Sequence, residues 1–196
     1  MVNDNKTIGL VVQATDAAST ISRIREAEQA GIQQVWMTQS AGLLDTLTIF
    51  AVAATQTTSV RLGTAIVPVY PRHPMVMAQQ AATIDALAPG RLRLGVGTSH
   101  RHLMENLYGL AMPSPLAYLR EYVEVLRQVL WEGRVDHKGK FFRVSASIPR
   151  PAQVPLLISA LGEKAFRLAG EVADGAISWV CPVPYPVSYT HLTLPT

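Results

Sequence analysis

Short apolar runs alternate along the chain with longer segments in which apolar residues recur every three or four positions. Such runs are typical of buried strands, and such spacing is typical of helices. The strands predicted in this way are Thr7–Gln13, Gln34–Met37, Arg61–Val67, Leu92–Gly97, Pro155–Ser159 and Gly175–Trp179. Because helices separate most of these strands, the pattern predicts βαβ units and a parallel sheet with helices outside it.

The helices are bounded by residues that suit helix ends. Asp16 and Asp45 are expected N-caps, and Pro74 suits a first helical position. The helix after Pro74 is expected to use a face with Val76, Gln80, Thr83, Ile84 and Leu87. A later helix is expected to bury Leu119, Tyr122, Val123, Leu126 and Val129.

Two long segments interrupt this order. Residues 100–115 and 133–153 are predicted to be loops, the second with a short β element near Phe141–Val144. Pro68 is expected to end the third strand, because proline cannot donate to a sheet. A helix over Gly162–Ala173 precedes the last strand.

The fold class predicted from these elements is α/β. An α/β barrel and an open doubly wound sheet both fit. About six strands precede residue 180 in a chain of 196 residues, whereas a closed (β/α)₈ barrel has eight strands and about 250 residues. Residues 1–180 are therefore interpreted as one incomplete barrel domain. Residues 181–196 continue no pattern and are interpreted as an irregular tail that is not native to the fold.

Composition narrows the class of protein. Hydrophobic residues make up 48% and charged residues 16%, which is typical of a globular chain. The net charge of +3 comes from scattered basic residues, so no nucleic-acid partner is expected. The apolar run near the N-terminus is too short to span a membrane. The single Cys181 excludes an intrachain disulfide and fits a cytoplasmic location.

Several segments between Thr7 and Trp179 together resemble the luciferase-like monooxygenase superfamily, and within it the deazaflavin-dependent oxidoreductases. The segments that carry this resemblance are Arg61–Val67, Pro71–Pro74, Ala78–Asp85, Gly90-Arg91, Gly95–Gly97, Glu121-Tyr122, Gly139 before Phe141-Phe142, and Ala169–Gly175. The resemblance implies a TIM-type (β/α)₈ barrel that binds coenzyme F420, or alternatively FMN, at the carboxyl ends of its strands. It also implies hydride transfer to or from a small organic substrate, and a chain that is truncated at its C-terminus.

The resemblance also implies which residues contact the cofactor. Ala65-Ile66 matches the place where relatives carry a cis peptide against the ring system, and residues 160–162 match the region used for the cofactor phosphate. A helix N-terminus suits phosphate because its N–H groups are free. The full set of cofactor-binding candidates is Gln39, Ser40, Ala65, Ile66, Gly97, Thr98, Ser99, Ala160, Leu161 and Gly162. No metal site is expected, because no His, Cys, Asp or Glu cluster has ligand spacing.

His100 is the catalytic candidate. It stands where deazaflavin-dependent sugar-phosphate dehydrogenases of the family carry a glutamate acid, and histidine can donate or accept a proton near neutral pH. The alternative is a solvated loop histidine beside Arg101 and His102. His73 is interpreted as a structural residue of a helix start, and Trp36, Trp131 and Trp179 as packing residues.

Other functions remain open at this point. An FMN-dependent monooxygenase is the first alternative to an F420-dependent oxidoreductase. A non-catalytic truncated barrel, or a homodimer that closes its open edges by association, is the second. A Rossmann dehydrogenase is disfavoured, because His100 occupies the third glycine position of the fingerprint and Glu121 lies inside a helix.

Overall fold

A curved parallel sheet organises the computed structural model, which describes residues 8–13 and 16–179. Its strands lie in the order β1 (Gly9–Val11), β2 (Gln34–Met37), β3 (Arg61–Thr64), β5 (Leu92–Gly97), β8 (Leu156–Ser159) and β9 (Gly175–Ile177). A short strand β4 (Val67–Pro68) follows β3 and also pairs with β5. Each strand lies beside the next one in this order, and the sheet curls as six of the eight strands of a (β/α)₈ barrel would.

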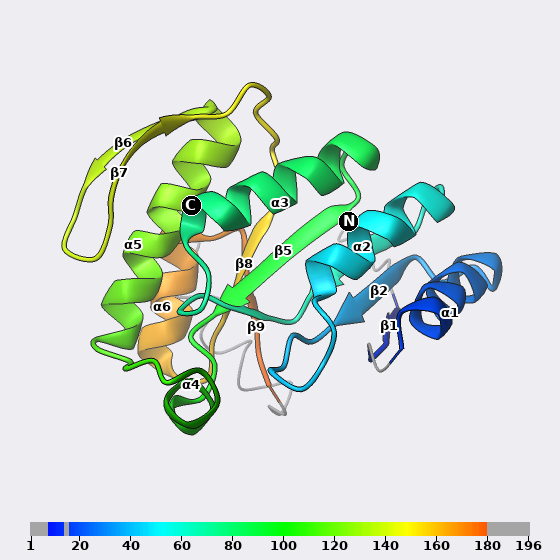
Figure 1. Cartoon of the computed structure of the whole chain (residues 1–196), viewed down its shortest axis with the longest axis horizontal. Helices are drawn as coiled ribbons and strands as arrows, with labels where there is room; N and C mark the ends of the chain where they lie inside the picture. The colour runs from blue at the N-terminus through cyan, green and yellow to red at the C-terminus, as the bar shows by residue number, and fades with distance from the viewer. Residues whose placement is uncertain (1–7, 14–15, 180–196) are drawn as a thin grey trace, which may run out of the picture.

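The helices cover the sheet, as Figure 1 shows. They are α1 (Ala17–Gln29), α2 (Thr46–Gln56), α3 (Pro74–Leu87), α4 (Arg101–Tyr108), α5 (Pro115–Arg127) with a π-helical extension η1 (Gln128–Glu132), and α6 (Glu163–Val172). No helix in the described part of the chain is long and apolar enough to cross a membrane.

The predicted helix caps are confirmed. A side-chain oxygen of Asp16 accepts the N–H of Ser19 at 2.7 Å, and one of Asp45 accepts the N–H of Thr48 at 2.8 Å. Nδ1 of His73 accepts the N–H of Met75, so His73 is the N-cap of α3, as expected. These side chains satisfy N–H groups that a helix start otherwise leaves unpaired.

The buried face of α5 was predicted correctly, whereas that of α3 was predicted correctly only at Ile84. Leu119, Tyr122, Val123, Leu126 and Val129 are all buried. In α3 the buried residues are instead Pro74, Met77, Ala78, Ala81 and Ile84. Val76 and Leu87 are nearly half exposed. The α3 helix therefore packs through small alanines, which an apolar-spacing argument based on large residues overlooks.

Both predicted long loops contain regular structure. Helix α4 occupies 101–108, where Leu103, Met104, Leu107 and Tyr108 recur at helical spacing over only two turns. The second segment forms an antiparallel hairpin of β6 (Arg134–Lys138) and β7 (Arg143–Ser147). Figure 1 shows this hairpin lying along α5. The predicted third strand is divided into β3 and β4, and strand pairing ends at Pro68, the last residue of β4, which pairs with Gly97.

A buried carboxylate attaches the tip of the hairpin to α5. Glu121 is 9% exposed and accepts the N–H groups of Lys140, Phe141 and Phe142, while Nε2 of His137 lies 3.2 Å from its Oε1. A side chain at Gly139 would collide with this carboxylate. Burial alone would raise the pKa of Glu121, but the N–H groups of Phe142 and Phe141 and the His137 ring outweigh it and hold the pKa below its ordinary value.

We expect Glu121→Gln to lower the free energy of unfolding by about 2–3 kcal/mol, because an amide nitrogen would then face backbone N–H donors. In the unsubstituted chain this contribution is complete above the ordinary carboxyl pKa of 4.5 and is lost as the pH falls through the lower pKa of the folded state. Urea unfolding at several pH values measures both effects.

Glu124→Gln on the same helix is the matched control, because the Glu124 carboxylate contacts no polar partner among the described residues. It should change the free energy of unfolding by less than about 0.5 kcal/mol. Equal losses in the two variants would contradict a specific role of Glu121.

Candidate functional site

A cavity of about 480 Å³ lies at the carboxyl ends of the strands. In Figure 1 the arrowheads of β2 and β5 point toward this end of the sheet, where α4 lies. The lining residues come from the strand exits and from α4, α5 and the start of α6. They are Thr38, Gln39, Ser40, Ala41, Ala65, Ile66, Pro68, Thr98, Ser99, His100, Leu103, Met104, Tyr108, Leu116, Leu119, Ser159, Leu161, Gly162, Ala165, Ile177 and Trp179.

The floor of the cavity lies where β3 gives way to β4. The Ala65–Ile66 peptide bond is cis, as the resemblance implied. The Ala65 N–H donates to the Met37 carbonyl at 2.8 Å, and the Ile66 carbonyl accepts the Gln39 N–H at 3.3 Å. This peptide is therefore tied to the exit of β2.

The hydroxyl of Thr64 joins the floor to β5. It donates to the Gly95 carbonyl at 2.7 Å and accepts the Gly95 N–H at 2.8 Å. Thr64 is fully buried. Gly95 lies between the residues of β5 that pair with β3 and those that pair with β4. The two bonds therefore satisfy its N–H and its carbonyl where strand pairing does not.

The structure brings eight of the ten cofactor-binding candidates, and His100, to this cavity. Their polar groups are not all available to a ligand. Oε1 of Gln39 accepts the N–H of Thr46 at 2.7 Å and so caps the entry to α2. Its Nε2 lies 3.5 Å from the Ser40 carbonyl. Gln39 can therefore offer its amide N–H groups to a ligand, but its carbonyl oxygen is occupied.

Gly97 and Ala160 do not line the cavity. Gly97 is buried behind Ser159, and a side chain there would collide with the Ser159 hydroxymethyl group. Ala160 is 1% exposed, and its N–H donates to the Ile177 carbonyl at 2.9 Å. Both residues shape the strand ends, and their neighbours Thr98 and Leu161 face the cavity instead.

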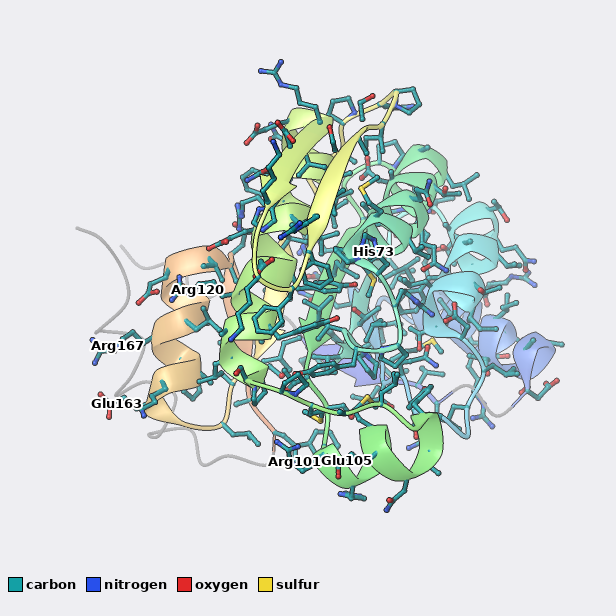
Figure 2. All side chains as sticks on the ribbon, turned by 60° about the vertical axis from the view of Figure 1, so that its left-hand side comes forward. His73, Arg101, Glu105, Arg120, Glu163 and Arg167 are labelled. Carbon is teal, nitrogen blue, oxygen red and sulfur yellow. The ribbon has the colours of Figure 1, made fainter. Side chains whose placement is uncertain are left out.

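The start of α6 reaches the cavity through Leu161 and Gly162. Gly162 is the N-cap, and no side chain caps this helix. Glu163 pairs with Arg167 at 3.0 Å, and Figure 2 shows both side chains on the outer side of α6. The acidic group that follows Gly162 is therefore directed away from the cavity, so the helix N-terminus can receive an anion.

Sequence patterns did not predict the far wall. Leu103, Met104 and Tyr108 come from α4, and Leu116 and Leu119 come from α5. Trp179 lines the cavity and is 64% exposed, so its interpretation as a packing residue is wrong. Trp131 does pack, with the Arg127 guanidinium 4.1 Å above its ring. The recurrence of Leu103, Met104, Leu107 and Tyr108 at helical spacing was the sequence signal that would have identified this wall.

The cavity suits a flat, largely apolar ring system with a polar edge. Among its described lining residues only His100 and Tyr108 are ionisable, and none is Lys, Arg, Asp or Glu. The residues at 38–40 and 98–100, which leave β2 and β5, supply hydroxyl, amide and imidazole groups. No group of three or more potential metal ligands occurs among the described residues. A deazaflavin or flavin fits this set of donors and this volume.

Comparison with known proteins identifies the family. The model of the luciferase-like monooxygenase family matches residues 5–186. The chain belongs to this family.

Its relatives include enzymes named for coenzyme F420. The chain is 40% identical over 148 residues to an F420-dependent glucose-6-phosphate dehydrogenase of Nakamurella multipartita, covering 71% of this chain and 42% of the relative. It is 28% identical to the 5,10-methylenetetrahydromethanopterin reductase of Archaeoglobus fulgidus, covering 79% of this chain and 47% of the relative. The chain therefore spans about half the length of these relatives.

A solved structure agrees with the fold. The coenzyme F420 dependent tetrahydromethanopterin reductase of Methanopyrus kandleri superimposes with a TM-score of 0.78 at 25% identity, over 88% of this chain and 55% of that one. The expected barrel architecture is thus confirmed.

We expect Thr64→Val to lower the free energy of unfolding by about 2 kcal/mol, because it leaves both backbone groups of the buried Gly95 without a partner. Thr64→Ser keeps the hydroxyl and should cost only about 1 kcal/mol for the lost methyl group. Urea unfolding of the three proteins separates the two effects. A serine variant as unstable as the valine variant would show that the methyl group, and not the hydroxyl, is what matters.

Proposed function

We propose that the protein is an oxidoreductase that uses coenzyme F420 to transfer a hydride to or from a small organic substrate. The observation that carries this proposal is the convergence of the strand-exit residues at 38–40, 65–66 and 98–100 on one apolar cavity. Membership of the family, together with a relative and a solved structure named for F420, supports the choice of cofactor.

The cofactor would lie between the floor and the far wall. Ala65 and Ile66 would support the ring, and the Gln39 amide with the hydroxyls of Thr98 and Ser99 would bind its polar edge. The start of α6 at Leu161 and Gly162 would hold its phosphate. When bound, the deazaflavin would accept or supply the hydride, and these residues would hold it in position.

His100 is proposed as the acid or base. It is the N-cap of α4, it makes no capping hydrogen bond, and its ring stacks against His102 at 5.8 Å. It is exposed and lines the cavity mouth, so its ring nitrogens can reach a substrate there. A substrate alcohol must lose a proton when it gives up a hydride, and an imidazole can take that proton.

Titration of the full chain with F420 and with FMN tests the cofactor. We expect a change in the absorbance of F420, with a dissociation constant about tenfold lower than that for FMN. Tighter binding of FMN would instead favour the monooxygenase. Binding of neither cofactor by a folded chain would favour the non-catalytic fragment.

We expect His100→Ala to lower kcat by about a hundredfold while changing the dissociation constant of F420 less than threefold. Such a loss reflects proton transfer and not binding. His102→Ala is the control, because His102 neighbours His100 but does not line the cavity. Unchanged turnover in His100→Ala, or equal losses in the two variants, would refute the acid–base role.

Two further properties belong to this proposal. The sequence favours a cytoplasmic enzyme that acts on small molecules, and it allows a homodimer. Size-exclusion chromatography with light scattering measures the oligomeric state directly.

A further inference from the structure

The far wall of the cavity is held differently from its floor. Helices α4 and α5 supply the wall, and residues 109–114 connect them. This connection begins at Gly109 with φ of +65° and ends at Ser114 with φ of +47°, both in the left-handed region. It contains no regular structure and forms no sheet with the barrel. Backbone bonds join its ends to the adjacent helices, from the Leu110 N–H to the Met104 carbonyl and from the Tyr118 N–H to the Ser114 carbonyl, so side chains are what join it to the strands and to α3.

Two side chains from outside the connection bind adjacent carbonyls in it. Nη2 of Arg101 donates to the Met112 carbonyl at 3.2 Å, and the Tyr70 hydroxyl donates to the Pro113 carbonyl at 3.0 Å. Arg101 belongs to α4, so its bond joins two parts of the wall to each other. Tyr70 lies between β4 and α3, so its bond joins the connection directly to the barrel, in addition to the packing of α5 in the core.

The Tyr70 ring is fixed in place. It stacks on the Tyr118 ring with centroids 4.2 Å apart and planes 14° apart. Tyr118 in turn contacts Phe141 and Phe142, at the hairpin tip that Glu121 clamps. A ring packed in this way loses little further conformational entropy when its hydroxyl donates. Burial, reinforced by Tyr118, raises the pKa of Tyr70 to about 12, so the hydroxyl keeps its proton at neutral pH.

We infer that Tyr70 is a positioning residue: its hydroxyl bond to the Pro113 carbonyl holds α4 and the start of α5 over the cofactor cavity. Tyr70 does not line the cavity. It acts through the connection on Tyr108 and Leu116, which flank the connection and do line the cavity. The part of this inference that concerns the cofactor rests on the proposed function.

Tyr70→Phe tests the inference, because it removes the hydroxyl and keeps the stacked ring. Tyr118→Phe is a matched control: the same stack loses its other hydroxyl, which donates to no other residue among those described. Hydrogen exchange of the Leu110 amide, which donates to the Met104 carbonyl at 3.0 Å, is followed in the free chain and reports on the connection without any cofactor. We expect this amide to exchange about three- to tenfold faster in Tyr70→Phe and unchanged in Tyr118→Phe.

The same variants are then titrated with F420. We expect Tyr70→Phe to bind it about threefold more weakly and Tyr118→Phe to bind as the unsubstituted chain does. Unchanged exchange in Tyr70→Phe, or equal acceleration in both variants, would overturn the inference, since the hydroxyl would then not hold the connection. Faster exchange with unchanged affinity would also overturn it, since the connection would then not position the site.

These outcomes are distinct from failure of the proposed function. If the unsubstituted chain does not bind F420, the proposed function fails, and the exchange experiment still decides whether Tyr70 anchors the wall. If it does bind F420, both parts of the inference are tested.

Discussion

The structure of the site depends on one hydroxyl group. The pairing of β3 with β5 stops before the Ala65–Ile66 peptide, and the pairing of β4 with β5 begins after it. Between the two pairings, the Thr64 hydroxyl bonds both backbone groups of Gly95. Without this bond the buried Gly95 would have unpaired polar groups. With it, the chain can leave the ladder at Ala65, present a cis peptide to the cavity and return to pairing at Val67. The floor is thus a break in the sheet at which the Thr64 side chain satisfies the backbone groups that strand pairing leaves free.

Much of the barrel could be predicted from the sequence, because the physical signals are local. Buried parallel strands read as apolar runs, and Asp16, Asp45 and Pro74 mark helix starts by their own chemistry. The errors arose where the signal is tertiary. Helix α4 buries only Met104 completely, and α3 packs through Ala78 and Ala81. The tip of the hairpin is bound by Glu121, whose four partners lie 16 to 21 residues further along the chain.

The candidate site also has a part that could be predicted from the sequence and a part that could not. Residues at strand exits, such as Gln39 and Thr98, were predictable because the carboxyl ends of parallel strands meet at one edge. Their detailed roles were not, since the Gln39 carbonyl oxygen caps α2 and Gly97 lies behind Ser159. The far wall comes from helices whose placement depends on contacts distant in sequence, such as Tyr70 with Pro113. No periodicity encodes such a contact.

The separate construction of floor and wall has an evolutionary consequence. The floor is bound by strand pairing and by Thr64, so substitutions there disturb the whole sheet. The wall at residues 101–116 joins the barrel through a few side chains, and its cavity-facing residues Leu103, Tyr108 and Leu116 take no part in the sheet. Selection can therefore change the size and shape of the cavity through these residues while its floor stays constant. The part of the cavity that is free to vary is thus separate from the part that the sheet fixes.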